Sequence, residues 1–418
     1  MTIGVSELTG RVRGVSYGWW VAIMGGLGMA LTVGPFEHGV STLFAGIEDD
    51  TGWSRATVSA AASVGHLSVG MMMPINGLLV DRLGSGRMAL TGLLITGLGA
   101  ILLSRVADPI WYYAAFLVTS AGIGLGAFTP AMAAVNAWLS ERRATGIAII
   151  EGGASAGVLL APVLAWSITT HGWRPSVAAI GVVLVLFAPL AYKVMSRPAP
   201  RQEPEEQGSA REASNRPNRR VADYTLAEAM RTRAFWAMIG SHTLINLALA
   251  TVGAHLVLHL TDEGMSLGAA SVVLTIVGAL NFAGHLAGGV VGDRVNKQYA
   301  VVALFGIQSA AIAFLAFVDS FFLAMVFAVL WSIGWGMRPP IFHALRGDYY
   351  GRRHFGAILG FSELPLALGM TAAPVIVGWA QDVQGTYQWS FLALSVLGFV
   401  GTALMLLATP PRRQPRPR

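Results

Sequence analysis

Long apolar stretches separated by short polar segments dominate the hydrophobic pattern of this chain. A helix needs about 20 mainly apolar residues to cross the hydrocarbon core of a bilayer. Helices are expected because lipid offers no partner to unpaired backbone groups, and because the chain lacks the alternation over about ten residues that is typical of a membrane barrel. We predict twelve membrane-spanning helices, at 17–44, 57–80, 88–105, 110–138, 145–169, 174–195, 234–260, 268–292, 298–318, 320–345, 355–381 and 387–409.

The composition agrees with an all-α membrane protein. Of the 418 residues, 54% are hydrophobic and only 12% are charged, against about 25% charged in ordinary soluble domains. There is no cysteine, and we find no nucleophile elbow, no phosphate-binding glycine loop and no metal-ligand spacing. The sequence therefore predicts a protein that is not an enzyme, binds no cofactor or metal, and does not use ATP to drive transport.

Lysine and arginine are unevenly divided between the two sides of the predicted helices. With the N-terminus inside, the outer segments carry only Arg55, Arg105 and Arg174. The inner segments carry the basic residues of both chain ends and of a long linker, together with Arg82, Arg87, Arg142, Arg143, Lys193, Arg294, Lys297, Arg346, Arg352 and Arg353. Because basic loops stay in the cytoplasm, we predict a multi-pass cell-membrane protein with both termini cytoplasmic. The basic excess does not indicate nucleic-acid binding.

A polar linker divides the predicted helices into two groups of six. It is rich in Pro, Arg, Glu and Ser and cannot bury a core. The helical spacing of Leu226, Met230 and Ala234 predicts a short helix on the membrane surface after it. The predicted parts are a cytoplasmic N-terminus (1–16), a first six-helix bundle (17–196), the linker with its surface helix (197–232), a second six-helix bundle (233–410) and a basic cytoplasmic tail (411–418).

The two groups of helices resemble each other in sequence. "GLLVDRLGSGR" (77–87) recurs as "GGVVGDRVNKQ" (288–298), with Asp81 and Asp293 separated by 212 positions (293 − 81). "SERRATG" (140–146) recurs as "YGRRHFG" (350–356), and Pro162 and Pro374 are again 212 positions apart. These repeats indicate a duplicated unit of six helices.

"GLLVDRLGSGR" resembles the signature G-x-L-x-D-R-x-G-x-x-R of the major facilitator superfamily, and its second copy lies where the family also carries it. "YGWWVAIMGG", "TGWSRATVS" and "GDYYGRRHFGAILG" are similar to the branch of oxalate/formate antiporters and monocarboxylate transporters. The resemblance implies two pseudo-symmetric bundles that rock around a central site. It also implies a cytoplasmic latch between the bundles, which we assign to Gly77, Asp81, Arg82, Arg87, Glu151, Asp293 and Arg294.

Several polar residues inside the predicted helices are candidates for a functional role, because placing an ionisable group in the bilayer costs about 2.5–3.5 kcal/mol of insertion free energy. The branch carries an Asp and an Arg on its eighth helix, and these positions fall on Asn281 and His285 here. The i,i+4 spacing puts both on one helix face, so they either bind substrate or bridge helices. A basic residue of the first helix falls on His38, or on Glu37 with a shift of one. We interpret His38 as a substrate or proton site, with a structural Glu37–His38 pair as the alternative.

Glu151 and Glu363 occupy equivalent places, each eleven residues before a proline. Glu151 is favoured as a latch residue that receives Arg87 or Arg142, while a buried carboxyl group can also carry protons. Glu363 remains open between these roles. The predicted proton-coupling candidates are His38, His285 and Glu363.

Arg338 is the strongest candidate for binding a substrate. If its helix reaches the cytoplasmic surface at Arg346, Arg338 lies about 12 Å deep, beyond the reach of snorkelling. Its guanidinium fork matches a carboxylate. Because the branch's usual arginine on the eighth helix is replaced by His285, we predict that Arg338 binds the anion. The alternative is a fixed ion pair with Glu363.

The sequence therefore predicts a secondary transporter of a small organic anion, a carboxylate, coupled to protons or working by exchange. We expect a monomer in the lipid bilayer. Two alternatives stay open at this point: an exporter of drugs or metabolites, and a membrane sensor that binds a solute without moving it.

Overall fold

The computed structural model describes residues 5–199 and 223–411 of the chain, and no β-strand occurs in these ranges. The helices are α1 (Val5–Val33), η1 (Gly34–His38), α2 (Val40–Thr51), α3 (Arg55–Leu83), α4 (Ser85–Leu103), α5 (Pro109–Gly126), α6 (Phe128–Trp138), α7 (Arg143–Ala156), η2 (Gly157–Leu159), α8 (Leu160–His171), α9 (Trp173–Met195), α10 (Leu226–Met230), α11 (Arg233–Asp262), α12 (Leu267–Gly292), α13 (Lys297–Leu315), α14 (Phe321–Tyr350), α15 (Phe355–Gln384) and α16 (Gln388–Leu406).

Twelve segments are long and apolar enough to cross a membrane, which confirms the predicted number of spans. Most spans are single helices, but the fourth joins α5 to α6 and the fifth joins α7, η2 and α8. The first span ends at His38 rather than at residue 44, because a wide helical turn containing Pro35 separates α1 from α2. Proline lacks the N–H group that a regular helix would need at that point.

Side chains at the helix starts explain several boundaries. Ser54, Asp108, Thr232, Ser266 and Ser320 each accept a hydrogen bond from a backbone N–H in the first turn of the helix that follows. These N–H groups have no partner within their own helix. A short helix follows the linker as α10, only five residues long, and Thr225 and Glu228 form its capping box. Ala234 of the predicted pattern lies in α11, and a position of α10 on the membrane surface stays a prediction. The linker before it lies mostly outside the described residues.

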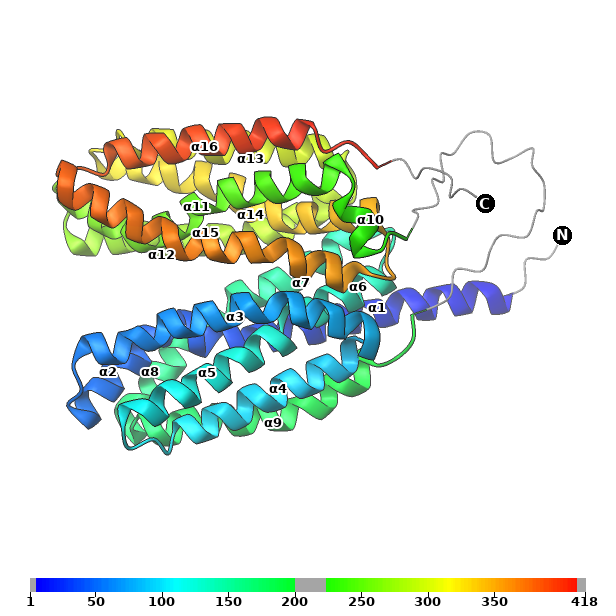
Figure 1. Ribbon diagram of the computed structural model, residues 1–418, viewed down its shortest axis with the longest axis horizontal. Helices are drawn as coiled ribbons and strands as arrows, with labels where there is room; N and C mark the ends of the chain where they lie inside the picture. The colour runs from blue at the N-terminus through cyan, green and yellow to red at the C-terminus, as the bar shows by residue number, and fades with distance from the viewer. Residues whose placement is uncertain (1–4, 200–222, 412–418) are drawn as a thin grey trace.

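The helices form two bundles, α1–α9 and α11–α16, which Figure 1 shows one above the other. The chain enters along α1 and leaves after α16 at one end of the molecule, which we call the termini side; the opposite end is the far side. The bundles meet where α3 packs along α15 and α7 packs along α12 and α14. In Figure 1 they lie closest toward the termini side. This interface brings polar residues of both bundles together.

Candidate functional site

Arg338 is completely buried (0% exposed) in the middle of α14. Its Nη1 donates to Nδ1 of His242 (3.3 Å) and its Nη2 donates to Oδ1 of Asn246 (2.9 Å), one turn apart on α11. The rings of Trp335 and Phe305 lie 4.6 and 5.0 Å from the guanidinium carbon. Among the described residues, Nε of Arg338 has no hydrogen-bond partner. Arg338 is thus a buried cation whose hydrogen-bond partners are neutral.

Arg338 lies deeper than the sequence indicated, because α14 continues past Arg346 to Tyr350. Twelve residues of helix at about 1.5 Å each place it about 18 Å from that end. The helix runs unbroken through Pro339 and Pro340. Arg346 itself is only 2% exposed, because the surrounding helices enclose it one turn before the end of α14; its level relative to the membrane surface stays a prediction.

Arg346, not Arg338, forms the ion pair with Glu363. Nη1 of Arg346 donates to Oε1 of Glu363 at 2.9 Å and lies 3.1 Å from Nδ1 of His343. Both members of the ion pair are buried. Removing one partner of such a pair leaves a buried charge without compensation and costs about 3–5 kcal/mol. The pair therefore fixes α14 against α15.

Each arginine also fixes the protonation state of one histidine. His242 receives an N–H of Arg338 at its Nδ1, and His343 receives an N–H of Arg346 at its Nδ1. An imidazole that accepts at Nδ1 is neutral and carries its proton on Nε2. Both Nε2 atoms point toward a carboxylate, at 3.6 Å for His242 and Glu363 and at 3.7 Å for His343 and Glu151.

These contacts form one continuous chain in the order arginine, histidine, glutamate, twice over. The ion pair between Arg346 and Glu363 joins the two runs. We call this set the buried network: Asn246, Arg338, His242, Glu363, Arg346, His343 and Glu151.

Glu151 brings the first bundle into the network. It lies on α7 and faces His343 of α14, so the structure places it away from the Arg87 and Arg142 contacts that we predicted. One turn further along α7, Oγ of Ser155 lies 3.4 Å from Nδ1 of His285. The helix α7 therefore makes two polar contacts with histidines of the second bundle.

The other predicted binding residues lie beside the network or away from it. Asn281 and His285 lie one turn apart on α12, and Oδ1 of Asn281 is buried without a partner among the described residues. The ring of His285 stands edge-on to Trp335, with centroids 6.4 Å apart. Glu37 and His38 are exposed in η1, and no contact of theirs with the network occurs in the described structure. A role for these residues in binding stays a prediction.

Asp81 and Asp293 each bind the start of a helix in the opposite bundle. The carboxylate of Asp81 accepts from the N–H groups of Gly356 (2.9 Å) and Ala357 (2.8 Å) at the start of α15. The carboxylate of Asp293 accepts from the N–H groups of Ala144 (2.9 Å) and Thr145 (3.0 Å) at the start of α7. Helix N-termini favour negative charge. The two contacts are related by the shift of 212 positions, and they hold the bundles together on the termini side.

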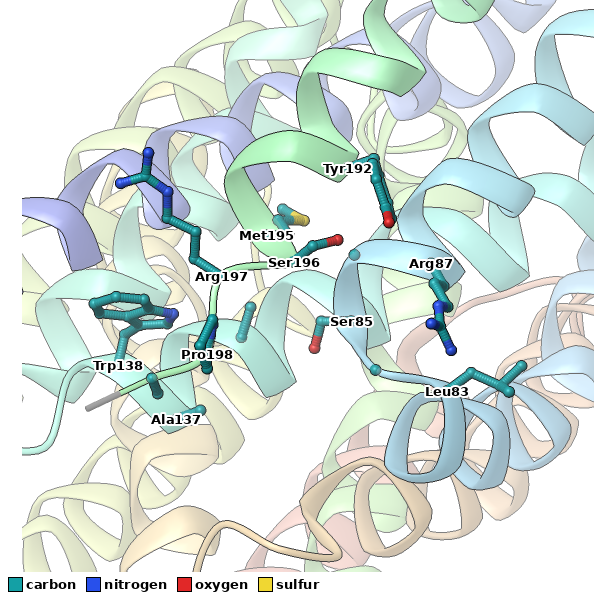
Figure 2. A pocket seen from close by; sticks show the side chains of 14 residues that line it. Leu83, Ser85, Arg87, Ala137, Trp138, Tyr192, Met195, Ser196, Arg197 and Pro198 are labelled. Carbon is teal, nitrogen blue, oxygen red and sulfur yellow. The ribbon is translucent and has the colours of Figure 1, made fainter. Parts of the chain in front are cut away.

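Other residues assigned to the latch have different surroundings. A Cβ atom at Gly77 would overlap the carbonyl oxygen of Gly356, so this glycine permits the close approach of α3 and α15. Arg82 and Arg294 are exposed. Arg87 lines a separate pocket of about 420 Å³ at the end of the first bundle, together with Ser196 and Arg197 (Figure 2). The part of these residues in transport stays a prediction.

Further ion pairs close the same side. Arg143 of α7 pairs with Asp348 of α14, and Lys297 of α13 approaches the other oxygen of Asp348 at 2.8 Å. Nδ2 of Asn136 donates to the carbonyl oxygen of Gly351 at 3.1 Å. Together with the aspartate contacts, these interactions hold the two bundles together on the termini side.

Sequence reasoning missed the place of three residues in the network. His242 and Asn246 had no predicted role, and Arg346 was predicted only as the place where its helix reaches the cytoplasmic surface. The i,i+4 spacing of His242 and Asn246 inside an apolar helix was the available signal. Within the described ranges, no group of three or more His, Asp or Glu residues could hold a metal ion.

The profile described as Major Facilitator Superfamily matches residues 19–345 and 300–418. The chain belongs to the major facilitator superfamily. It is therefore a multi-pass secondary transporter and not an enzyme. The transporter's fold is like that of the fucose:proton symporter of E. coli, with a TM-score of 0.72, 17% identity, and coverage of 94% of this chain and 99% of the other.

Relatives with known names are distant. The transporter is 24% identical to the oxalate:formate antiporter of Oxalobacter formigenes over 387 residues, 90% of this chain and 88% of the relative. It is 23% identical to monocarboxylate transporter 12-B of Danio rerio over 362 residues, 80% of this chain and 75% of the relative. Monocarboxylate transporter 13 of Rattus norvegicus is 25% identical over 361 residues, 84% of this chain and 79% of the relative.

Proposed function

We propose that this transporter moves a small organic anion, a carboxylate, across the cell membrane, with both termini in the cytoplasm. The observation that carries the proposal is Arg338, a fully buried cation held by His242 and Asn246, with an unpartnered Nε. Among the described residues, no carboxylate lies within ion-pair distance of it. A buried charge normally needs a partner, and a carboxylate substrate would supply one.

The path to Arg338 leads past Trp335. The ring of Trp335 covers the guanidinium at 4.6 Å and is itself only partly buried. It also stands edge-on to the ring of His285, with centroids 6.4 Å apart. A movement of this ring would open Arg338 toward His285 and Asn281, the pair that we predicted from the sequence. Guanidinium binds a carboxylate through two parallel hydrogen bonds. The site would therefore accept a small anion with a free carboxylate.

The orientation and the working cycle follow from the charge pattern and the contacts between the bundles. Basic residues gather on the termini side, which supports a cytoplasmic location for that side. The described structure would then be closed to the cytoplasm. Rocking of the bundles would carry the site between the two faces, driven by protons or by exchange, with the transporter acting as a monomer. His38, His285 and Glu363 remain the proton-coupling candidates from the sequence.

Thermal unfolding of the purified protein with acetate, lactate, oxalate and benzoate tests the proposed substrate class. A ligand that binds the folded state raises the unfolding temperature. We expect at least one of these anions to stabilise the wild type but not Arg338→Lys, because lysine cannot make the bidentate contact. Arg346→Lys is the matched control, since its point charge can still pair with Glu363. Equal stabilisation of the wild type and Arg338→Lys by every binding anion would refute the assignment, and no stabilisation by any carboxylate would refute the substrate class.

A further inference from the structure

The contact between Glu151 and His343 crosses from one bundle to the other inside the membrane. Oε1 of Glu151 lies 3.7 Å from Nε2 of His343, and the side chains are 14% and 5% exposed. Counting from Arg143 at the start of α7, Glu151 is eight residues in, about 12 Å along the helix. The latch contacts of Ala144 and Thr145 lie between it and the termini side. Glu151 is therefore shielded from that side and still partly accessible.

The two glutamates of the network differ in their partners. Glu363 is bound by the guanidinium of Arg346 at 2.9 Å, which holds it in the charged form. Glu151 faces only the imidazole of His343, whose Nδ1 already accepts from Arg346. His343 cannot take up a proton without losing that bond. Of the groups along this path, Glu151 is the one that can gain a proton without breaking an ion pair.

The groups around Glu151 come from several elements. The helices α1, α6, η1 and η2 also pack on α7. Gly25–Val33, α6 and η2 contain no titratable side chain, whereas η1 carries Glu37 and His38, which are exposed. The titratable and charged groups of the second bundle that surround it are His343, Arg346 and Arg338 of α14, Glu363 of α15, His242 of α11 and His285 of α12.

We propose that Glu151 is the proton site of this transporter and that its bridge to His343 couples protonation to the movement of the bundles. The charged carboxylate lies 3.7 Å from the Nε2–H of His343, and its electrostatic attraction to this N–H favours the form closed on the termini side. Taking up one proton from the far side gives a neutral carboxyl group. A neutral carboxyl group attracts this N–H much less than a charged carboxylate does, so protonation weakens the contact between the bundles. The proton leaves Glu151 once the termini side has opened.

This inference rests on the proposed function for its link to transport, but the bundle movement can be measured without any substrate. The natural chain has no cysteine, so spin labels can be placed at Ser140→Cys and Val295→Cys, two exposed positions on the termini side of opposite bundles. Lowering the pH from about 8 to about 5 spans the titration of most carboxyl groups in such sites. We expect the ratio of closed to open forms in the wild type to fall about fivefold.

Glu151→Gln mimics the protonated form. We expect it to show the low ratio at every pH and to lose the pH response. The matched control is Glu141→Gln, an exposed glutamate before the same helix that makes no contact with the network in the described structure, and it should respond like the wild type. A wild type without pH response, or a Glu151→Gln variant that keeps it, would overturn the proposal.

The two proposals fail separately. If the wild type responds to pH through Glu151 but no carboxylate stabilises it, the proton site stands and the substrate class is wrong. If carboxylates bind through Arg338 but the distance between the two spin labels does not change with pH, the substrate class stands and the proton site is wrong. Should Glu151→Gln not fold, Glu151→Asp supplies the second measurement. It keeps a titratable carboxyl group and should keep the pH response, and a flat response in that variant would overturn the proposal.

Discussion

Replacing Asp81 by asparagine changes one side of the latch with very little change in shape. In the wild type, both carboxylate oxygens accept a backbone N–H, from Gly356 at 2.9 Å and Ala357 at 2.8 Å. Asparagine keeps one acceptor oxygen and turns an NH2 group toward the other N–H. Hydrogen bonds to charged groups contribute about 1.5–3 kcal/mol each. One bond is lost and the other loses its charge, so we expect the closed form to weaken by about 2–3 kcal/mol.

That loss corresponds to a decrease of about 30- to 160-fold in the ratio of closed to open forms. The labels at Ser140→Cys and Val295→Cys report it directly, because the distance between them grows when the termini side opens. Transport should also slow more than substrate binding weakens, since Asp81 acts on the movement and lies outside the buried network. The measurement needs no knowledge of the substrate.

Two further variants make the result interpretable. Asp108 also accepts two N–H groups, from Ile110 and Trp111, but these belong to the helix that it caps within its own bundle. Both bonds go to Oδ1, which asparagine keeps, and asparagine caps helices as well as aspartate does, so Asp108→Asn should change neither the unfolding temperature nor the label distances. Asp293→Asn removes the symmetric contact and should open the termini side as Asp81→Asn does. Unchanged distances in Asp81→Asn, at matched amounts of reconstituted protein, would show that the latch does not hold the bundles.

Three further results are expected. Glu363→Gln leaves Arg346 buried without its carboxylate, so the free energy of unfolding, measured by thermal unfolding, should fall by about 3–5 kcal/mol. An equal loss in the exposed control Glu141→Gln would refute a specific effect of the buried ion pair. Gly77→Val forces α3 away from the carbonyl oxygen of Gly356 and should lengthen the label distances, whereas Gly268→Val, in open space, should not. Trp335→Leu removes the ring over Arg338 and should cost about 2 kcal/mol of stability, which Trp335→Phe should partly restore. Identical unfolding temperatures for the wild type and Trp335→Leu would refute a stabilising contact between Trp335 and Arg338.

The twelve spans and the duplication could be read from the sequence, because both depend on local patterns of apolar residues and repeated motifs. The positions of Asp81 and Asp293 were marked by the same repeat. Most of their partners lie in the second repeated motif, but the pairing itself could not be read, because a backbone N–H at the start of a distant helix carries no side-chain signal. The end of α14 was misplaced for a related reason. Hydropathy ends a span at a charge, whereas here Glu363 and His343 compensate the charge and α14 continues to Tyr350.

The duplication also explains why the network crosses between the bundles. Glu151 and Glu363 are 212 positions apart, so each half inherited one carboxylate. The cations were not inherited equally: the positions that correspond to Arg338, His343 and Arg346 in the first half are Gly126, Ala131 and Ala134. Glu363 therefore finds its arginine on the neighbouring helix of its own bundle. Glu151 has no such neighbour and must reach across the interface to His343, which makes its contact depend on how the two bundles are arranged.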